Sequence, residues 1–469
     1  MTIHTNAIAA AMFTAACLTA SANVPQITER NMAQEQTTRM VTITYTLADA
    51  PAVVTLDVQT NCVVGTVTNW ASIGGHALWN ASGDVWKRVE TGPHTITWQP
   101  VDTWPGHSIP DGGARAVITA WATNNTPDYM VVDLTDVPDA DRFRYYPGAD
   151  FLPRANFAQT GDPATGNPIY KTSKLLMRKI MARGVEWTMG AESDEWGYMP
   201  SNELTHYARL TNNYYIGVFE ITQRQWALVA TNSTIAAKYQ TEGAMRPMTG
   251  MCYNEIRNTA NETTADPTHD WPAKPALGSF LGLLRTKTGL DFDLPTEAQW
   301  ELAARAGNGS GYWNDGSLIV GGGSWTAEQA ELSNLARYLC NGGRVGGVDP
   351  DESCGPTNGT AIVGSYAPNS WGLYDTIGNA AEWCLDFYEA DIATAKDADG
   401  ALYAGRLNIN PADSTLTLGG ENANGLRVSR GGSYQSNPRN CRLAYRLSLV
   451  AKNRYLYAGL RVVCTSGLE

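Results

Sequence analysis

Alternating apolar and polar residues in the first third of the chain predict β-strands. Residues 41–47 place Val, Ile, Tyr and Leu at every second position, which puts these side chains on one face of an extended strand. Pro, Gly, Asn and Asp separate this stretch from further strand-like runs at 52–58, 94–98, 114–123 and 129–134. Because no helical pattern interrupts them, residues 36–147 are predicted to form an all-β sandwich of the immunoglobulin or fibronectin type. We see no catalytic cluster in this stretch, which favours a role as a spacer or docking module.

The pattern changes after residue 147. Residues 148–175 are rich in Pro, Gly, Asp and Asn and are predicted to be a linker. Further on, a helix is predicted to begin at Thr296, whose side chain can cap it while Gln299 reaches back, and to end at Gly307. A second helix is predicted over 218–229, opened at or shortly before Thr222.

Composition narrows the class of protein. The chain of 469 residues has 45 Gly and 15 Trp, which is typical of a loop-rich fold with large aromatic side chains in its core. Its net charge of -12 provides no basic surface for phosphates, so no nucleic-acid partner is expected. No run of 18 apolar residues occurs, so no transmembrane segment is predicted.

The N-terminus indicates export. Residues 7–22 are small and apolar and end in Ala20-Ser21-Ala22, so residues 1–22 are predicted to be a signal peptide, although residues 1–6 lack Lys and Arg. The residues before Cys17 match a lipoprotein signal poorly, and we therefore expect a soluble periplasmic, cell-surface or extracellular protein. Disulfides are plausible in such a compartment, and Cys340 with Cys354 and Cys441 with Cys464 are candidate pairs.

Six ordered sequence blocks follow residue 177. They contain WTMG (187–190), YIGVFEITQ (215–223), LPTEAQWELAARAG (294–307), WGLYD (371–375), GNAAEWC (378–384), and a final block of RGGSY (430–434), RLAYR (442–446) and GLR (459–461). Together they resemble the formylglycine-generating enzyme, or sulfatase-modifying factor, family. The resemblance implies an α+β domain with a C-type-lectin-like fold over residues 176–469. The arginines of the final block are predicted to bind loop carbonyls and acids as scaffolding.

The catalysis that this resemblance implies depends on two positions. Enzymes of the family are copper-dependent oxidases that convert a substrate cysteine to formylglycine, and they use two cysteine thiolates five residues apart. The matching residues are Ser436 and Cys441. A hydroxyl is a hard ligand and cannot replace a thiolate on Cu(I), so copper is not expected. Cys441 would be catalytic only in an active enzyme, and is otherwise expected to be buried or disulfide-bonded.

The resemblance also implies structural calcium, which prefers oxygen ligands from flexible loops. The ligands of one site map to Asp375, Gly378, Ala380 and Glu382, with the alternative that Glu382 is a buried acid bonded to backbone amides. A second site would use Asn334 and Leu335 with further ligands near residues 349–352.

Large apolar and aromatic residues occupy places in the last block that are polar in many relatives. The segment is similar to that of variable proteins diversified by retroelements, in which the fold displays changeable side chains to a ligand. We expect the side chains of Leu447, Leu449, Tyr455, Leu456 and Tyr457 to form one solvent-facing patch. The predicted ligand-binding residues are Tyr434, Ser436, Leu447, Ser448, Leu449, Tyr455, Leu456 and Tyr457.

Two functions are compatible with these observations. The favoured one is an exported, non-catalytic display protein that binds an unknown protein or glycan ligand. The alternative is a sulfatase-modifying oxidase. The serine at position 436 favours the first.

Overall fold

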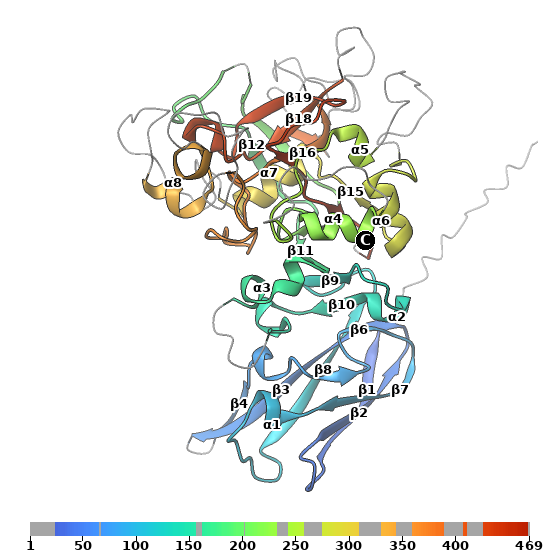
Figure 1. Cartoon of the computed structure of the whole chain (residues 1–469). Helices are drawn as coiled ribbons and strands as arrows, with labels where there is room; N and C mark the ends of the chain where they lie inside the picture. The colour runs from blue at the N-terminus through green and yellow to red at the C-terminus, as the bar shows by residue number, and fades with distance from the viewer. Residues whose placement is uncertain are drawn as a thin grey trace, which may run out of the picture.

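The computed structural model describes residues 24–64, 67–155, 162–200, 202–231, 243–257, 274–308, 330–343, 359–388, 407–409 and 425–467. The predicted signal peptide lies outside these residues. The chain forms two lobes, a sheet-rich N-terminal lobe and a larger C-terminal lobe of mixed sheets and helices (Figure 1). Within the described ranges, no helix combines the length and apolar character needed to cross a membrane.

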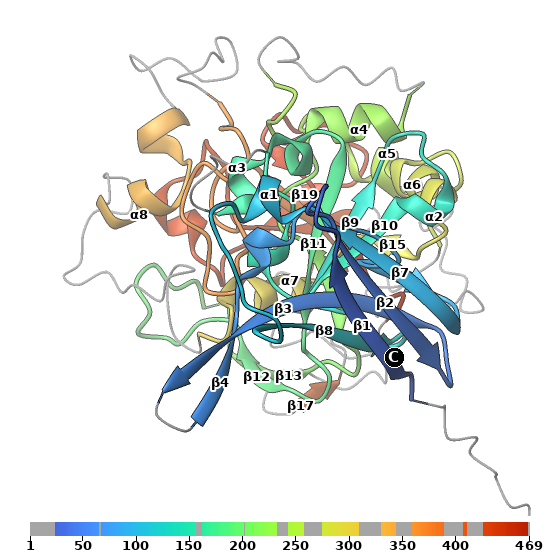
Figure 2. The same ribbon diagram turned by 90° about the horizontal axis from the view of Figure 1, so that it is seen from below.

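Two sheets build the N-terminal lobe, as the alternating pattern predicts. In β2, Ile43, Tyr45 and Leu47 are buried while the residues between them are more exposed, so one face of the strand packs into the core. One sheet has the order β1 (Gln26–Gln34), β2 (Val41–Ala48), β7 (Gly92–Trp98), β5 (Ser82–Gly83). In the other, β3 (Ala52–Val64) pairs with β4 (Val67–Ser72), β6 (Lys87–Val89) and β8 (Ala114–Ala122). The β3–β4 hairpin extends to one side of the lobe (Figure 2), and the short helices are η1 (Gly75–Ala77) and α1 (Pro100–Thr103).

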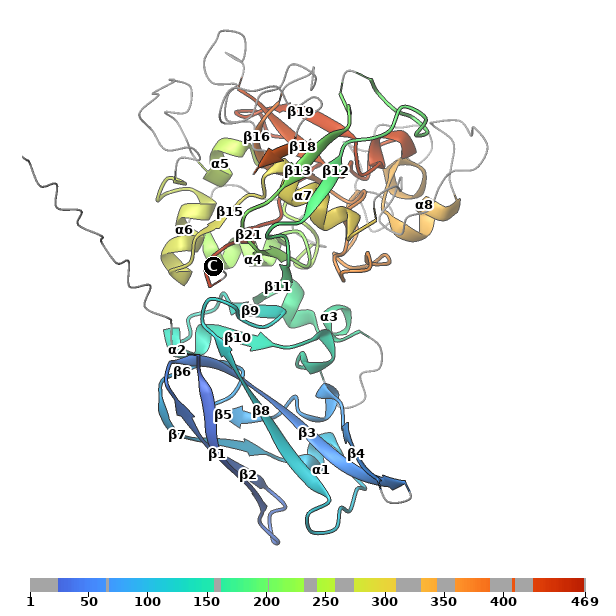
Figure 3. The same cartoon turned by 180° about the vertical axis from the view of Figure 1, so that it is seen from behind.

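The last strand expected in the sandwich belongs to a different sheet. It forms as β9 (Tyr129–Asp133), but it pairs with β11 (Lys174–Ile180) and with β10 (Phe143–Tyr146), which follows α2 (Asp139–Arg142). Met130 and Val132 are fully buried in the core of the C-terminal lobe. The expected role of 129–134 as a sandwich strand is therefore wrong, because its apolar side chains complete the neighbouring core. Figure 3 shows β9, β10 and β11 at the junction of the lobes.

The segment predicted as a linker contains ordered, packed structure. It includes η2 (Ala149–Phe151), α3 (Pro163–Gly166) and η3 (Pro168–Lys171). Asn167 and Tyr170 are buried and both donate hydrogen bonds to the carbonyl of Pro153, at 2.9 and 3.2 Å. The described part of 148–175 is thus packed against the fold, because its Asn and Pro residues form capped turns.

Three sheets organise the C-terminal lobe. The largest has the order β10, β9, β11, β14 (Tyr214–Gly217), β21 (Val463–Cys464), β15 (Phe292–Asp293). The second is β19 (Arg446–Val450), β18 (Leu426–Arg430), β16 (Ala381–Phe387), β20 (Ala458–Gly459), and the third is β12 (Glu186–Met189), β13 (His206–Arg209), β17 (Leu407–Ile409). Helices α4 (Gln223–Val229), α5 (Tyr253–Arg257) and α6 (Phe280–Thr288) pack together, and α7 (Glu297–Arg305) lies against β12, β16 and β18. The remaining short helices are α8 (Ala330–Leu335), the π-helical segment η5 (Leu339–Gly343) and η8 (Pro438–Cys441).

Both predicted helix starts carry a capping box. Thr296 accepts from the Gln299 amide at 3.1 Å while Gln299 accepts from the Thr296 amide at 2.9 Å, and Thr222 and Gln225 repeat this arrangement. The helix predicted over 218–229 therefore begins only at Gln223, because Thr222 must be non-helical to cap it. At the other end of α7, the left-handed residue is Ala306 with φ +49°, directly before Gly307.

We predict that a chain starting at residue 148 is much less stable than a chain starting at residue 124. Removal of Met130, Val132 and Leu134 from the core costs about 5–9 kcal/mol, against a domain stability of about 5–15 kcal/mol. The measurement is thermal unfolding by circular dichroism, with size-exclusion chromatography. Equal melting temperatures for the two chains would show that β9 and β10 do not stabilise the C-terminal lobe.

Candidate functional site

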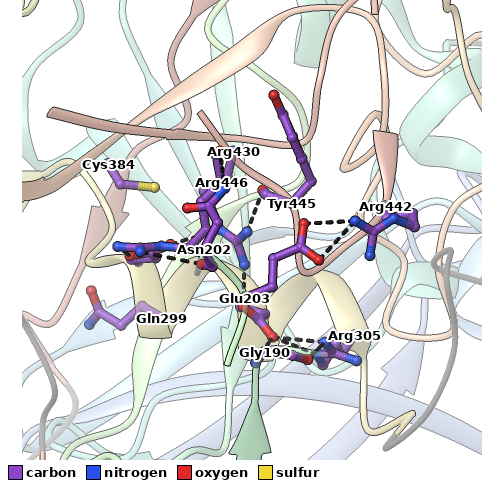
Figure 4. Close-up of polar contacts among 12 residues, drawn as sticks. Gly190, Asn202, Glu203, Gln299, Arg305, Cys384, Arg430, Arg442, Tyr445 and Arg446 are labelled. Atoms are coloured by element: carbon purple, nitrogen blue, oxygen red, sulfur yellow. Dashed lines mark hydrogen bonds and ion pairs between the residues drawn. The ribbon is translucent and has the colours of Figure 1, made fainter. Parts of the chain in front are cut away.

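A network of buried arginines and acids occupies the centre of the C-terminal lobe (Figure 4). Helix α7 supplies Glu297 and Glu301, one turn apart, and both side chains are almost completely buried. Arg446 from β19 binds Glu297 with Nε to Oε1 at 2.7 Å, and Arg430 from β18 binds both acids. Burial alone would raise the pKa of Glu297, but Arg446 and Arg430 lower it below its usual value.

A second arm of the network fixes the turn that follows η8. Arg442 is fully buried and donates from Nη2 to both oxygens of Glu203, at 2.7 and 2.8 Å, and from Nη1 to Glu195 at 2.9 Å. Burial raises the pKa of Glu195 despite the neighbouring Arg442. The arginines of the last block bind acids and loop carbonyls inside the fold, which is the geometry of scaffolding.

The positions matched to the copper-binding thiolates lie beside this network. Cys441 is fully buried, its Sγ lies 4.0 Å from the carbonyl oxygen of Ser436, and burial raises the pKa of its thiol well above the usual value. The hydroxyl of the half-buried Ser436 accepts from the Ser433 amide at 2.9 Å. One thiol paired with a hydroxyl, which is a hard ligand, does not form a Cu(I) site, so these two residues do not fit copper.

The candidate disulfide between Cys441 and Cys464 does not form. Both residues carry thiols, and they lie in different hydrophobic clusters of the lobe. Cys354 of the other candidate pair lies outside the described residues.

One cysteine near Cys441 was not predicted as part of this site. The Leu339 amide donates to the Ser436 carbonyl at 3.1 Å, which brings the exposed Cys340 close enough to affect the Cys441 thiol electrostatically. No spacing in the sequence indicates this proximity, since the contact depends on how η5 folds against the Gly-Gly-Ser-Tyr turn.

The residues matched to the first calcium site lie in one turn and strand, but Glu382 is already occupied. It accepts from Trp300 Nε1 at 2.7 Å and from Arg461 Nη2 at 2.6 Å, and Arg461 Nε reaches both of its oxygens. Glu382 is a buried acid, as the alternative expects, but its partners are side chains rather than backbone amides. Glu382 does not fit a calcium ligand in this arrangement.

Asp375 differs from Glu382 because only one of its carboxylate oxygens is hydrogen-bonded. It is buried, Oδ2 accepts from the Gly364 amide at 2.6 Å, and Oδ1 has no hydrogen-bond donor. Burial, together with repulsion from Glu382, raises the pKa of Asp375 to about 6, and burial beside Asp375 and Glu382 also raises the pKa of Glu220. An orphaned buried carboxylate oxygen fits a cation, so Asp375 is the residue of this turn that could bind calcium.

The rest of the calcium prediction has little support in the geometry. The Ala380 amide donates to Glu220 at 2.9 Å and the Gly378 amide donates to the Gly431 carbonyl at 2.8 Å. A metal would bind the carbonyl oxygens of these residues, which neither hydrogen bond involves. The described residues contain no group of three or more His, Cys, Asp or Glu side chains arranged for a metal. At the second site, Asn334 is exposed and Leu335 is buried at the end of α8, and residues 349–352 lie outside the described part of the chain.

The expected solvent-facing patch is only partly exposed. Leu449 is 3% exposed, so its expected place in the patch is wrong. The cause is the strand period: β19 pairs with β18 and turns Leu449 into the core that also contains Trp383. Tyr434, which was predicted to bind ligand, is 1% exposed. The other members of the predicted set are half-buried: Leu447, Ser448, Tyr455, Leu456 and Tyr457. The centroid of the Tyr455 ring lies 6.1 Å from that of Trp383 and 5.6 Å from that of Tyr457.

We predict that Arg442→Gln lowers the free energy of unfolding by about 3–5 kcal/mol, because Glu203 and Glu195 would be left buried without their cation. Arg454→Gln is the matched control, because Arg454 is 55% exposed and pairs with Glu255 at the surface, where such pairs contribute about 1 kcal/mol or less. Urea unfolding of both variants measures the difference. Equal losses would mean that the buried pair has no special role in stability.

A further prediction concerns Asp375→Asn. The raised pKa of Asp375 means that its contribution to stability is present below its unfolded value of 3.8 and is lost as pH rises through about 6. Without calcium, the free energy of unfolding of the variant should therefore rise relative to that of the wild type between pH 4 and 7, by about 3 kcal/mol at most. Calcium should then raise the melting temperature of the wild type at pH 7.5 and leave the variant unchanged.

The control is Asp111→Asn, which changes an exposed acid. Its melting curves should follow those of the wild type at every pH. Parallel pH curves for wild type and Asp375→Asn would contradict the buried-charge argument, and an equal response of both to calcium would remove Asp375 as a ligand.

Comparison with known proteins assigns the C-terminal lobe to a family. Formylglycine-generating enzymes of Thermomonospora curvata and Streptomyces coelicolor are 32% and 34% identical to this chain over 150 and 164 residues. These stretches make up 32% and 34% of this chain but only 40% and 41% of the enzymes, so the chain spans well under two thirds of either relative. Treponema denticola variable protein 1 superposes with a TM-score of 0.41 at 22% identity, covering 62% of this chain and 95% of that protein. The family model of the sulfatase-modifying factor enzyme 1-like domain matches residues 171–466, which is more than half of the sequence, and the chain therefore belongs to that family.

Proposed function

We propose that this chain is an exported, non-catalytic binding member of the family. The observation that carries the proposal is the state of the two positions at which the enzymes would hold copper. Ser436 presents a hydroxyl that is bonded within its own turn, and Cys441 presents a fully buried thiol with a raised pKa.

This geometry is unsuited to the oxidase reaction for two reasons. A soft metal ion needs two thiolates, and the hydroxyl of Ser436 cannot replace one of them. A substrate cysteine would also need access to the metal, and the Cys441 side chain is 0% exposed.

The binding face that we propose is the half-buried set at the end of the chain. Leu447 comes from β19, while Tyr455, Leu456 and Tyr457 come from the turn before β20. Ser448 lies between Leu447 and Leu449 in the strand, so its side chain leaves the opposite face of β19 and we do not include it in the binding face. Core contacts of Tyr455 and Tyr457 restrict their rings, so these side chains would lose little entropy when a ligand binds. Leu449 would support this face from below, because it belongs to the same hydrophobic cluster as Leu447, Tyr455 and Tyr457.

The remaining features of the proposal rest on the sequence. A signal peptide over residues 1–22 would direct export to the periplasm, cell surface or surroundings, and the acidic chain would bind a protein or glycan rather than nucleic acid. We further propose a C-type-lectin-like fold for the C-terminal lobe, an immunoglobulin- or fibronectin-like topology for the N-terminal sheets, and a structural calcium ion at Asp375. Diversification of the last segment by a retroelement belongs to the same proposal.

A binding screen tests the function. The full chain is presented to arrays of purified glycans and extracellular proteins, and bound ligands are then measured with Leu456→Arg and Leu277→Arg variants. Leu456 lies in the proposed face, whereas Leu277 is 80% exposed elsewhere and serves as a matched control. We expect Leu456→Arg to weaken binding by about tenfold or more and Leu277→Arg to leave it unchanged, with melting temperatures confirming that both variants fold.

The oxidase alternative has its own readout. Protein loaded with Cu(I) is incubated with a Cys-x-Pro-x-Arg peptide, and peptide thiol loss and aldehyde formation are followed. We expect neither. Turnover that disappears in Cys441→Ala would establish the enzyme and overturn the proposal, and the same assay on Cys340→Ala would show whether Cys340 supplies the second thiol.

A further inference from the structure

Two cysteine-bearing turns from distant parts of the sequence meet at one carbonyl group. The Ser436 oxygen accepts from the Leu339 amide at 3.1 Å, and the Cys441 Sγ lies 4.0 Å from the same oxygen. Cys340 is the residue next to Leu339, in the π-helical segment η5, and Cys441 is the last residue of η8. The hydrogen bond thus fixes the two cysteine-bearing turns against each other.

The two thiols differ in their access to solvent. Cys340 is exposed, whereas Cys441 is fully buried between the Gly-Gly-Ser-Tyr turn and the cluster that contains Trp300 and Leu443. A Cβ placed on Gly432 would lie 3.1 Å from the Cys441 sulfur, which leaves little room on that side. The electrostatic influence of Cys340 on the Cys441 thiol agrees with their proximity.

We propose that Cys340 and Cys441 form a reversible disulfide that ties η5 to the turn after β18. This pairing differs from both pairs that the sequence suggests, and it does not depend on the proposed binding function. Its formation needs no metal ion, only the two thiols and a small-molecule disulfide as the oxidant.

The chemistry is thiol–disulfide exchange in two steps. The exposed Cys340 thiolate attacks one sulfur of glutathione disulfide, so the glutathione S–S bond breaks and one glutathione thiolate leaves. The Cys441 thiol then loses its proton and attacks Sγ of Cys340 in the mixed disulfide, which forms the Cys340–Cys441 bond and releases the second glutathione thiolate. Two electrons pass from the protein to glutathione, and the two thiol protons end on the released glutathione molecules or in solvent.

The burial of the two residues determines the order of these steps. Only Cys340 is accessible to an external disulfide, while Cys441 can react only with a sulfur already held next to it. The second step takes place inside the core, where Cys441 is fully buried, so it should be slower than the first. The product closes a long loop of chain and should therefore raise the melting temperature.

Peptide mapping of the full chain tests this inference. Protein equilibrated in glutathione buffers of increasing oxidation is alkylated, digested without reductant and analysed by mass spectrometry. We expect a cross-linked peptide joining Cys340 to Cys441 and a higher melting temperature of the oxidised protein. The conservative variant Cys340→Ser should lose both the cross-link and the rise in melting temperature, while the Cys252→Ser control should keep both.

Two outcomes would overturn the inference. One is a Cys340–glutathione adduct that never resolves, because it would show that Cys441 cannot reach Cys340. The other is a cross-link between Cys340 and Cys354. Since Cys340 is at the surface, the serine variant is expected to fold, so loss of the cross-link can be separated from loss of structure by the melting curve.

Discussion

Glu297 and Glu301 on α7 bind arginines that follow them in the sequence by 149 and 129 residues. These ion pairs connect α7 to β18 and β19, and the Glu301 carboxylate also accepts from the Gly190 amide near β12 at 2.9 Å. The strands of this lobe are short, so the hydrogen bonds between paired strands alone fix the positions of few helices and strands relative to one another. Buried carboxylates that each bind several donors define many more, because a displaced arginine would leave a charge in the core without a partner.

The same arrangement recurs where calcium was expected. Arg461 binds Glu382 and also donates to the carbonyls of Gly217, Val218 and Tyr374. The Arg461 guanidinium thus gives its positive charge and its hydrogen bonds to carboxylate and carbonyl oxygens. These are the kind of oxygen atoms that a metal cation would bind. Asp375, which lies outside this set of bonds, is left with an orphaned oxygen and a raised pKa. Of the two predicted carboxylate ligands, Asp375 is therefore the one that could still bind calcium.

The sequence predicted those parts of the fold that local chemistry determines. The capping boxes at Thr222 and Thr296 appear as expected, and the alternation in β2 gives the buried face that its pattern indicates. The ordered blocks identified the family, because many residues must match in order for such a resemblance to arise. Buried arginines were predicted as scaffolding from their residue type.

Features that depend on distant contacts could not be predicted in this way. Nothing in the alternation of β9 tells which sheet it joins, since a strand buried on both faces fits either core. Leu449 was expected to bulge outward, but β19 continues its ladder with β18 and turns that side chain inward. The proximity of Cys340 to Cys441 likewise depends on a single backbone bond between remote turns.

The shared position of β9 has a mechanical consequence. β9 is followed by β10 and lies between β10 and β11 in one ladder, and Tyr145 of β10 donates its amide to the Trp86 carbonyl of the N-terminal lobe. If the N-terminal end of the chain were tethered and a ligand pulled on the other lobe, tension would pass into the β9–β11 hydrogen bonds rather than along a slack connector. The two lobes would then resist force as one unit, and a load large enough to separate them would first have to break the sheet of the C-terminal lobe.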